Sequence, residues 1–188
     1  MKYIIEHLEP RLYKWCFIEY SHISKIVGKN NLIFTNIKTD KMKDKLSKLG
    51  KVYQDSIVNL NDFKDKRICL LNADAEKTLD SKDHFGYLLF GGILGDNPPQ
   101  KRTAAKLGSM HLPERNLGKR QMPTDVAVYV ARKIVDGNQF KKMKFTDQLE
   151  IEIDKNESII LPFCYLIENG KPYVSEDLVS FIKKRRFL

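Results

Sequence analysis

The chain has 188 residues, of which 42% are hydrophobic and 30% are charged, so it can bury one full core and is too apolar for a disordered tail. A formal net charge of +9 would suit work close to RNA or a ribonucleoprotein, yet 24 acidic residues accompany 33 basic ones. The surface is therefore mixed, and charge alone identifies no partner.

Three cysteines, Cys16, Cys69 and Cys164, lie far apart in the sequence, with no second ligand at a spacing typical of metal sites. Their odd number and spacing predict neither a disulfide framework nor a metal site, and indicate buried thiols in a reducing compartment. The first ten residues are unlike a secretory signal, and no apolar stretch approaches the length of a membrane span. We expect a soluble, cytoplasmic protein with no membrane partner.

The first half of the chain predicts strands that alternate with helices. Apolar residues at helical spacing, among them Ile18, Ile23 and Ile26, indicate a helix that Gly28 ends. The lysines of the next helix are expected to form a solvated face. In chain order we predict a strand at 2–5, a helix that begins at Pro10, a strand at 31–37 and a helix at 40–49, which Gly50 ends.

Two near-continuous apolar runs, 66–73 and 86–94, are typical of parallel strands that helices cover on both faces. They predict an α/β fold with a mostly parallel sheet and helices on both faces. Residues 1–188 are interpreted as one domain, in which 147–188 form a C-terminal extension of strand, hairpin and helix. After the apolar runs we predict helices at 98–107 and 123–135, strands at 149–154 and 159–167, a turn at Asn169 and Gly170, and a last helix.

The segment GGILGDNPP, residues 91–99, follows the second apolar run, at the end of a predicted strand where ligands bind in such sheets. Glycine there lets a ligand approach the backbone without interference from a Cβ atom, and the prolines fix the exit of the loop. An ordinary strand-to-helix turn explains the same residues. The sequence lacks the Rossmann glycine fingerprint and the P-loop motif, which weighs against dinucleotide and nucleoside triphosphate sites.

A second unusual loop precedes the predicted helix at 123–135. In RNLGKRQMPTDVAVYVA, residues 115–131, Leu117 and Gly118 indicate a turn before the helix begins. Thr124 or Asp125 would also serve as an ordinary helix cap. Two such loops after two consecutive buried elements are the expected halves of one pocket.

The two loops together resemble a known family. The resemblance is carried by FGGILGDNPPQKRT and LGKRQMPTDVAV, with MKYIIEHLEP, Trp15 and EYS near the start and RICLL between. These segments are similar to the eukaryotic SPOUT-class methyltransferases that use S-adenosylmethionine to methylate an arginine of a small-subunit ribosomal protein. The resemblance implies a SPOUT-type α/β fold whose C-terminal part is threaded into a trefoil knot, with S-adenosylmethionine as cofactor.

The resemblance also implies that the two loops hold the cofactor between them. Ile93 and Met122 suit an apolar slot for adenine, while Asp96 can accept from ribose hydroxyls or face the sulfonium. Asn72 and Ala73 depart from the acidic residue and the proline that the family pattern has, so no role for Asn72 follows. The implied cofactor-binding residues are Leu71, Gly91, Gly92, Ile93, Leu94, Gly95, Asp96, Leu117, Gly118, Gln121, Met122, Thr124 and Asp125.

Transfer to an arginine requires carboxylates, because its guanidinium is a planar cation that acidic side chains grip and orient. The candidate catalytic residues are Glu6 and Glu9 at the end of the first strand, Glu19 on the following helix, and Asp96. Exposed carboxylates near a helix start also explain Glu6 and Glu9. Trp15, one turn before Glu19, fits the apolar face of its helix, and His7 would serve as a strand-end hydrogen-bonding group.

A chain of charge +9 repels a basic ribosomal protein unless acidic residues gather where that partner docks. Asp96, Glu6, Glu9 and Glu114 are therefore the residues expected to lie together. Arg102 and Arg115 flank the cofactor loops. The sequence leaves two roles open for these side chains, contact with the cofactor carboxylate or simple exposure to solvent.

Two other functions stay open. An RNA methyltransferase would have a continuous basic groove with exposed aromatic residues, and contact with ribosomal RNA is compatible with the charge. A non-catalytic, ribosome-associated binding protein would keep the fold without binding the cofactor. The resembled branch implies a monomer, whereas SPOUT proteins are usually dimers, and the sequence leaves that choice open.

Overall fold

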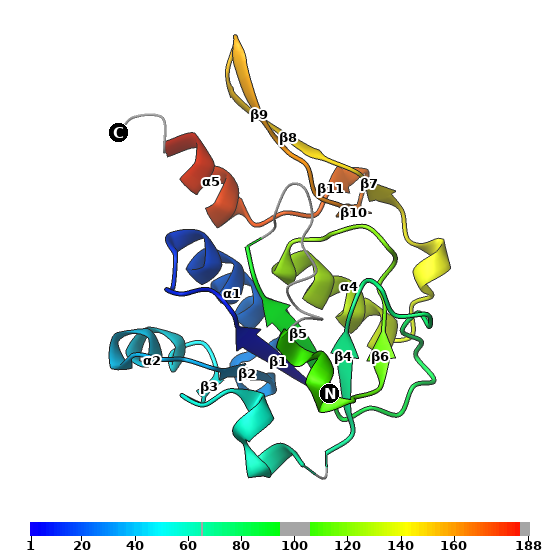
Figure 1. Ribbon diagram of the computed structural model, residues 1–188. Helices are drawn as coiled ribbons and strands as arrows, with labels where there is room; N and C mark the ends of the chain where they lie inside the picture. The colour runs from blue at the N-terminus through cyan, green and yellow to red at the C-terminus, as the bar shows by residue number, and fades with distance from the viewer. Residues whose placement is uncertain (65, 95–105, 185–188) are drawn as a thin grey trace.

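A six-stranded sheet forms the centre of the molecule (Figure 1). We analysed it in a computed structural model that describes residues 1–64, 66–94 and 106–184. The strand order is β3-β2-β1-β5-β4-β6, and every paired strand of this sheet runs parallel to its neighbour, as predicted. The strands are β1 (Lys2–His7), β2 (Leu32–Thr35), β3 (Lys51–Val52), β4 (Ile68–Leu71), β5 (Tyr87–Gly92) and β6 (Glu114–Arg115).

The α-helices differ from their predicted bounds mainly at their ends. The first begins at Lys14 because Tyr13 still has an extended backbone, with a ψ of 155°, and it ends at the predicted Gly28, whose φ is 81°. None of the described helices is long and apolar enough to cross a membrane. The predicted helix at 98–107 lies almost wholly outside the described residues. The helices are α1 (Lys14–Val27), α2 (Asp40–Leu46), α4 (Thr124–Val135) and α5 (Glu176–Lys184).

The two faces of the sheet bury separate apolar clusters. Successive residues of β5 alternate between them, since Leu88 and Phe90 join the larger cluster and Leu89 joins the smaller one. The larger cluster contains the inner faces of α1, α2, α4 and α5, and Figure 1 shows α1 and α4 side by side on that face. The smaller cluster is covered by the 3-10 helices η2 (Ile57–Asn59) and η3 (Asn61–Phe63) and by Leu107.

The C-terminal part adds short antiparallel pairs to this body. The predicted strand at 159–167 is two strands, because Pro162 cannot continue a ladder. The predicted turn is confirmed at Asn169 and Gly170, whose φ values are 50° and 79°. Figure 1 shows the hairpin of β8 and β9 projecting from the body, while α5 packs on α1. The strands are β7 (Phe145–Thr146), β8 (Leu149–Asp154), β9 (Glu157–Leu161), β10 (Tyr165–Glu168) and β11 (Lys171–Pro172).

Candidate active site

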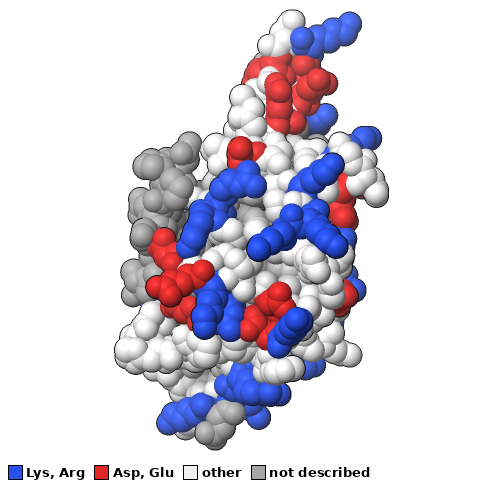
Figure 2. Space-filling view, turned by 90° about the vertical axis from the view of Figure 1, so that its right-hand side faces the viewer, with Lys and Arg blue, Asp and Glu red and all other residues white. Residues whose placement is uncertain are grey.

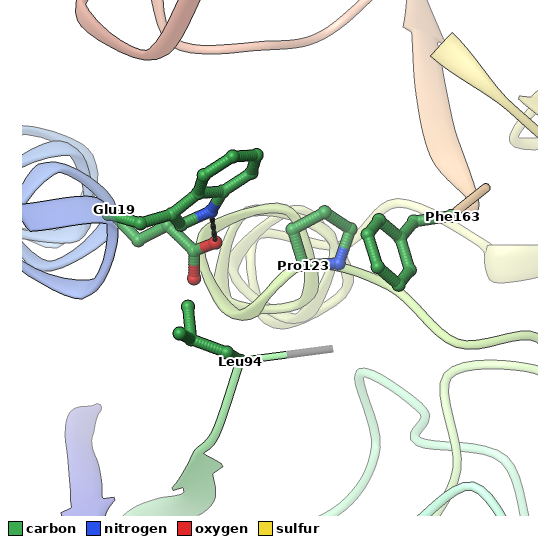
Figure 3. A pocket seen from close by; sticks show the side chains of 5 residues that line it. Glu19, Leu94, Pro123 and Phe163 are labelled. Atoms are coloured by element: carbon green, nitrogen blue, oxygen red, sulfur yellow. Dashed lines mark hydrogen bonds between the residues drawn. The ribbon is translucent and has the colours of Figure 1, made fainter. Parts of the chain in front are cut away.

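A cavity of about 190 Å³ lies where the ends of the two unusual loops approach α1. Its described lining consists of Trp15, Glu19, Leu94, Pro123 and Phe163. Figure 3 shows the Glu19 carboxylate pointing from α1 toward the space between Leu94 and Pro123, with Phe163 on the far side. The cavity is therefore apolar except for one carboxylate and the indole that holds it.

The pairing of β1 with β5 fixes the Leu94 side of the cavity. His7 lies opposite Gly92, and a Cβ atom on Gly92 would come within 2.8 Å of Ile5 Cγ2 and would also meet the Tyr20 hydroxyl. Only glycine allows this close approach at the strand end. Beyond it, the Leu94 N–H donates to Glu9 Oε1 at 2.9 Å, which directs Leu94 toward α1.

The start of α4 and a C-terminal segment form the opposite side. Pro123 precedes the helix and has an extended ψ of 149°, as suits the residue before a helix begins. The Cys164 N–H donates to the Gln121 backbone oxygen at 2.8 Å, which joins the segment that carries Phe163 to the loop before α4. Residues far apart in the sequence thus meet at one cavity.

Glu19 is the ionisable residue of the described cavity lining, and it is 5% exposed. The Trp15 indole N–H donates to Glu19 Oε1 at 2.7 Å. The pKa of Glu19 is raised to about 8, mainly by burial and also by the nearby Asp125 carboxylate, whereas donors from Trp15 and Thr124 oppose that rise. A carboxyl group with a pKa near neutrality can both bind a cation and accept a proton.

Glu6, by contrast, is part of the fold, and its predicted catalytic placement has to be corrected. It is 1% exposed, and its carboxylate accepts from the Thr35 hydroxyl, from Ser56 Oγ at 2.5 Å and from the Ile57 N–H at 3.1 Å. These bonds join β1 to β2 and to the segment after β3. Glu6 is not among the described residues that line the cavity, so its carboxylate joins these segments and is not placed to grip a guanidinium there.

The predicted gathering of acidic residues does not form among the described residues. Three strand steps separate Glu6 on β1 from Glu114 on β6, roughly 14 Å at the usual strand spacing. Glu114 instead accepts from Asn72 Nδ2 at 2.9 Å. Glu9 positions Leu94 as described above, and Asp96, like Gly95 and Arg102, lies outside the described residues.

Comparison with known proteins decides the family. The family model of the SFM1-like protein arginine N-methyltransferases matches residues 2–187. This chain belongs to that family. The protein arginine N-methyltransferase SFM1 of Saccharomyces cerevisiae is 38% identical to it over 203 residues, which cover 98% of this chain and 95% of the relative.

Two solved structures place the SFM1-like chain among known folds. A crystal structure of the yeast arginine methyltransferase SFM1 complexed with SAM has a TM-score of 0.89 at 38% identity, covering 100% of this chain and 92% of that one. A dual-specific Trm10 from Thermococcus kodakaraensis shares the fold alone, with a TM-score of 0.56 at 16% identity over 76% of this chain and 96% of that one. The SPOUT-type fold predicted from the motifs is confirmed, and the knot within it stays a prediction.

The remaining residues implied for the cofactor in this SFM1-like chain are not among the described residues that line the cavity. Leu71 ends β4, Gly91 is the last but one residue of the neighbouring strand β5, and Ile93 follows that strand. Leu117 is 8% exposed, and Met122 is partly buried against the larger cluster. In the loop before α4, Gly118 has a φ of 86° and lies under the Phe140 ring, while Gln121 anchors Cys164. Their contacts with a cofactor stay a prediction.

Two predicted residues of the family site face elsewhere. Asp125 is 1% exposed and accepts from His22 Nδ1 at 2.7 Å, so its carboxylate lies behind Glu19. Arg115 forms a two-pronged ion pair with Asp83, with Nη2 at 2.6 Å and Nε at 3.0 Å from the two carboxylate oxygens. Arg115 is therefore held by its own chain near β6.

Sequence reasoning missed Phe163 and undervalued Trp15. The break at Pro162 was the one local signal that the chain leaves a strand before Phe163. Nothing local indicates that Cys164 binds Gln121, which brings Phe163 to the cavity. Trp15 does pack on the larger cluster, but its N–H is directed at Glu19.

Proposed function

We propose that this SFM1-like chain is a protein arginine N-methyltransferase that uses S-adenosylmethionine, and that its acceptor is an arginine of a small-subunit ribosomal protein. The observation that carries the proposal is the buried Glu19 carboxylate, held by the Trp15 N–H in an apolar cavity between the two loops. The motifs that resemble the ribosomal-protein branch support the choice of acceptor. The three free, buried cysteines fit a cytoplasmic protein.

The cavity has the chemistry that the cofactor needs. S-adenosylmethionine, when bound, supplies an electrophilic methyl group on a sulfonium cation. Leu94, Pro123 and Phe163 offer apolar contact to a nucleoside, and the aromatic rings of Trp15 and Phe163 suit a neighbouring cation. These residues would hold part of the cofactor, because the cavity of about 190 Å³ is smaller than the sites that enclose whole nucleoside ligands.

Glu19 would bind and orient the acceptor. An ionised carboxylate accepts two N–H bonds from a guanidinium and keeps the positive charge of the guanidinium on the nitrogens that it holds. The remaining nitrogen is thereby turned toward the methyl donor. Methylation replaces a guanidinium N–H bond by an N–C bond and releases one proton. Glu19, with a pKa of about 8, can take that proton as it leaves.

The acceptor is tested by labelling. Hypomethylated small ribosomal subunits are incubated with the enzyme and with S-adenosylmethionine that carries a labelled methyl group. We expect label in methylarginine of one protein and none in nucleotides released by nuclease. Label in nucleotides would replace this proposal by an RNA methyltransferase, and label in neither would favour a non-catalytic binding protein.

Cofactor binding is tested separately by calorimetric titration with S-adenosylhomocysteine. Phe163→Ala removes one wall of the cavity, and burial of an aromatic side chain predicts a loss in affinity of about tenfold or more. Ile160→Ala is the matched control, since Ile160 is 52% exposed on the hairpin. A wild-type protein that gives no binding isotherm would overturn the proposal.

The surface seen in Figure 2 favours a protein acceptor. Lys and Arg side chains spread over the body with acidic side chains between them, rather than forming one uninterrupted basic band. The projecting hairpin carries exposed acidic residues, Glu150, Glu152, Asp154 and Glu157. Among the described residues on this face, the mixed charges do not form the long cationic track by which proteins follow a nucleic-acid backbone.

A further inference from the structure

Two buried carboxylates lie near each other where α1 meets α4. Glu19 is 5% exposed and Asp125 is 1% exposed. They approach from facing helices, because His22, about one turn after Glu19 on α1, lies 2.7 Å from Asp125 of α4, and the polar groups of Thr124 interact with Glu19. Two negative charges so close together and so far from water oppose each other's ionisation.

Asp125 is fixed in place by hydrogen bonds on both of its oxygens. His22 Nδ1 donates to Oδ2 at 2.7 Å, and the Val126 N–H donates to Oδ1 at 2.9 Å. Because a carboxylate only accepts, Nδ1 of His22 carries the proton that it donates to Asp125, and Nε2 lies 3.2 Å from the Tyr173 hydroxyl. Both oxygens of Asp125 are thereby held by donors of its own chain.

The C-terminal segment holds His22 from the outside. Tyr173, which follows β11, stacks on the His22 ring with a centroid separation of 5.3 Å. Tyr129 of α4 also stacks on Tyr173, with a separation of 3.8 Å between the ring centroids. This aromatic stack keeps His22 directed at Asp125.

The other titratable groups around Glu19 stay neutral. Cys16 and Tyr20 face it from α1, and Tyr165 faces it from β10. Burial raises the pKa of Cys16 to about 12 and raises those of Tyr20 and Tyr165 well above their usual values. Within the described part of the chain, Asp125 is therefore the group whose charge acts on Glu19.

We propose that Asp125, held by His22, is a positioning residue that opposes the negative charge of Glu19 until a cation enters the cavity. The inference rests on the proposed function, in which Glu19 receives an arginine. A guanidinium supplies the missing positive charge, so binding of the acceptor and loss of the proton from Glu19 occur together. A neutral side chain cannot bring about this ionisation, which adds selectivity for a cationic acceptor.

The test follows the titration of Glu19 in the free protein. Carboxyl-labelled glutamate gives a 13C signal for each glutamate side chain, and the signal that disappears in Glu19→Gln is that of Glu19. In Asp125→Asn, which keeps the size and the acceptor oxygen, we expect the midpoint of this signal to fall by about one pH unit or more. In Asp136→Asn, at the exposed far end of α4, we expect no shift.

A midpoint that stays unchanged in folded Asp125→Asn would overturn the proposal. If that variant does not fold, Asp125→Ser supplies a smaller neutral side chain with an oxygen acceptor for the Val126 N–H, and the same fall is expected. The titration needs no substrate, so it separates the two proposals. A shifted midpoint in a protein that methylates nothing would support the coupling and contradict the proposed function.

Discussion

Glu6, near the end of β1, and Glu19, within α1, are both buried glutamates, yet their surroundings differ. Glu6 accepts bonds from Thr35, Ser56 and Ile57, all within its own chain, and it joins the central strands. Glu19 accepts from the Trp15 indole N–H, interacts with the polar groups of Thr124, and lines the cavity. The difference teaches that a place on the wall of a cavity, rather than burial alone, separates a structural carboxylate from one that is available for chemistry.

The largest loss of methyl transfer is expected from substitution of Glu19. Glu19→Gln keeps the oxygen that accepts from Trp15 but removes the charge and the proton acceptor. We expect methyl transfer to fall by at least about 100-fold, while the affinity for S-adenosylhomocysteine changes by less than about threefold. Steady-state assays and calorimetry on the same preparation check this, and full activity in the variant would remove Glu19 from the mechanism.

At the strand end beside Glu6, Gly92→Ala is expected to act on folding. The added Cβ atom would lie 2.8 Å from Ile5 Cγ2 and 3.1 Å from the Glu6 backbone oxygen, and it would also meet the Tyr20 hydroxyl. We expect a loss of roughly 3 kcal/mol in the free energy of unfolding, measured by urea denaturation. Gly108→Ala is the control, because no atom of the described residues lies within 4 Å of its Cβ position. Equal stability of the two variants would contradict the packing described for Gly92.

Glu6→Gln tests whether Glu6 contributes to the stability of the fold rather than to methyl transfer. The amide keeps one acceptor oxygen but presents an N–H₂ group to donors, so we expect a loss of about 2 kcal/mol in the free energy of unfolding. The activity of each folded molecule should stay within about threefold of wild type. A stable variant that has lost methyl transfer would return Glu6 to the catalytic residues.

A smaller effect is expected from Trp15→Phe, which keeps an aromatic wall but removes the N–H donor to Glu19. Donors stabilise the charged carboxylate, so the pKa of Glu19 should rise by about one unit. At neutral pH, kcat/KM for the acceptor should then fall about tenfold, and raising the pH should recover most of it. A loss that is equal at every pH would mean that Trp15 acts through packing alone.

The central sheet was predictable because its causes are local. The residues of β4 and β5 are buried on both faces and therefore form apolar runs, and Gly28 and the Asn169–Gly170 pair mark ends and turns by their backbone freedom. The roles of Glu6 and Glu19, by contrast, depend on residues that are distant in the sequence. The donors to Glu6 come from Thr35 and Ser56, and Phe163 reaches the cavity through Cys164, so only the folded chain reveals which carboxylate is open.

The pH dependence of kcat/KM for the acceptor tests the account most directly. Because the pKa of Glu19 is raised to about 8, the group is mostly protonated at pH 7 and gains its charge as the pH rises. Wild-type kcat/KM should therefore increase about tenfold per pH unit below about pH 8 and level off above it. In Glu19→Gln, kcat/KM should not show this rise with pH. A wild-type profile that is flat between about pH 6 and pH 9 would contradict the assignment of Glu19 as the acceptor-binding carboxylate.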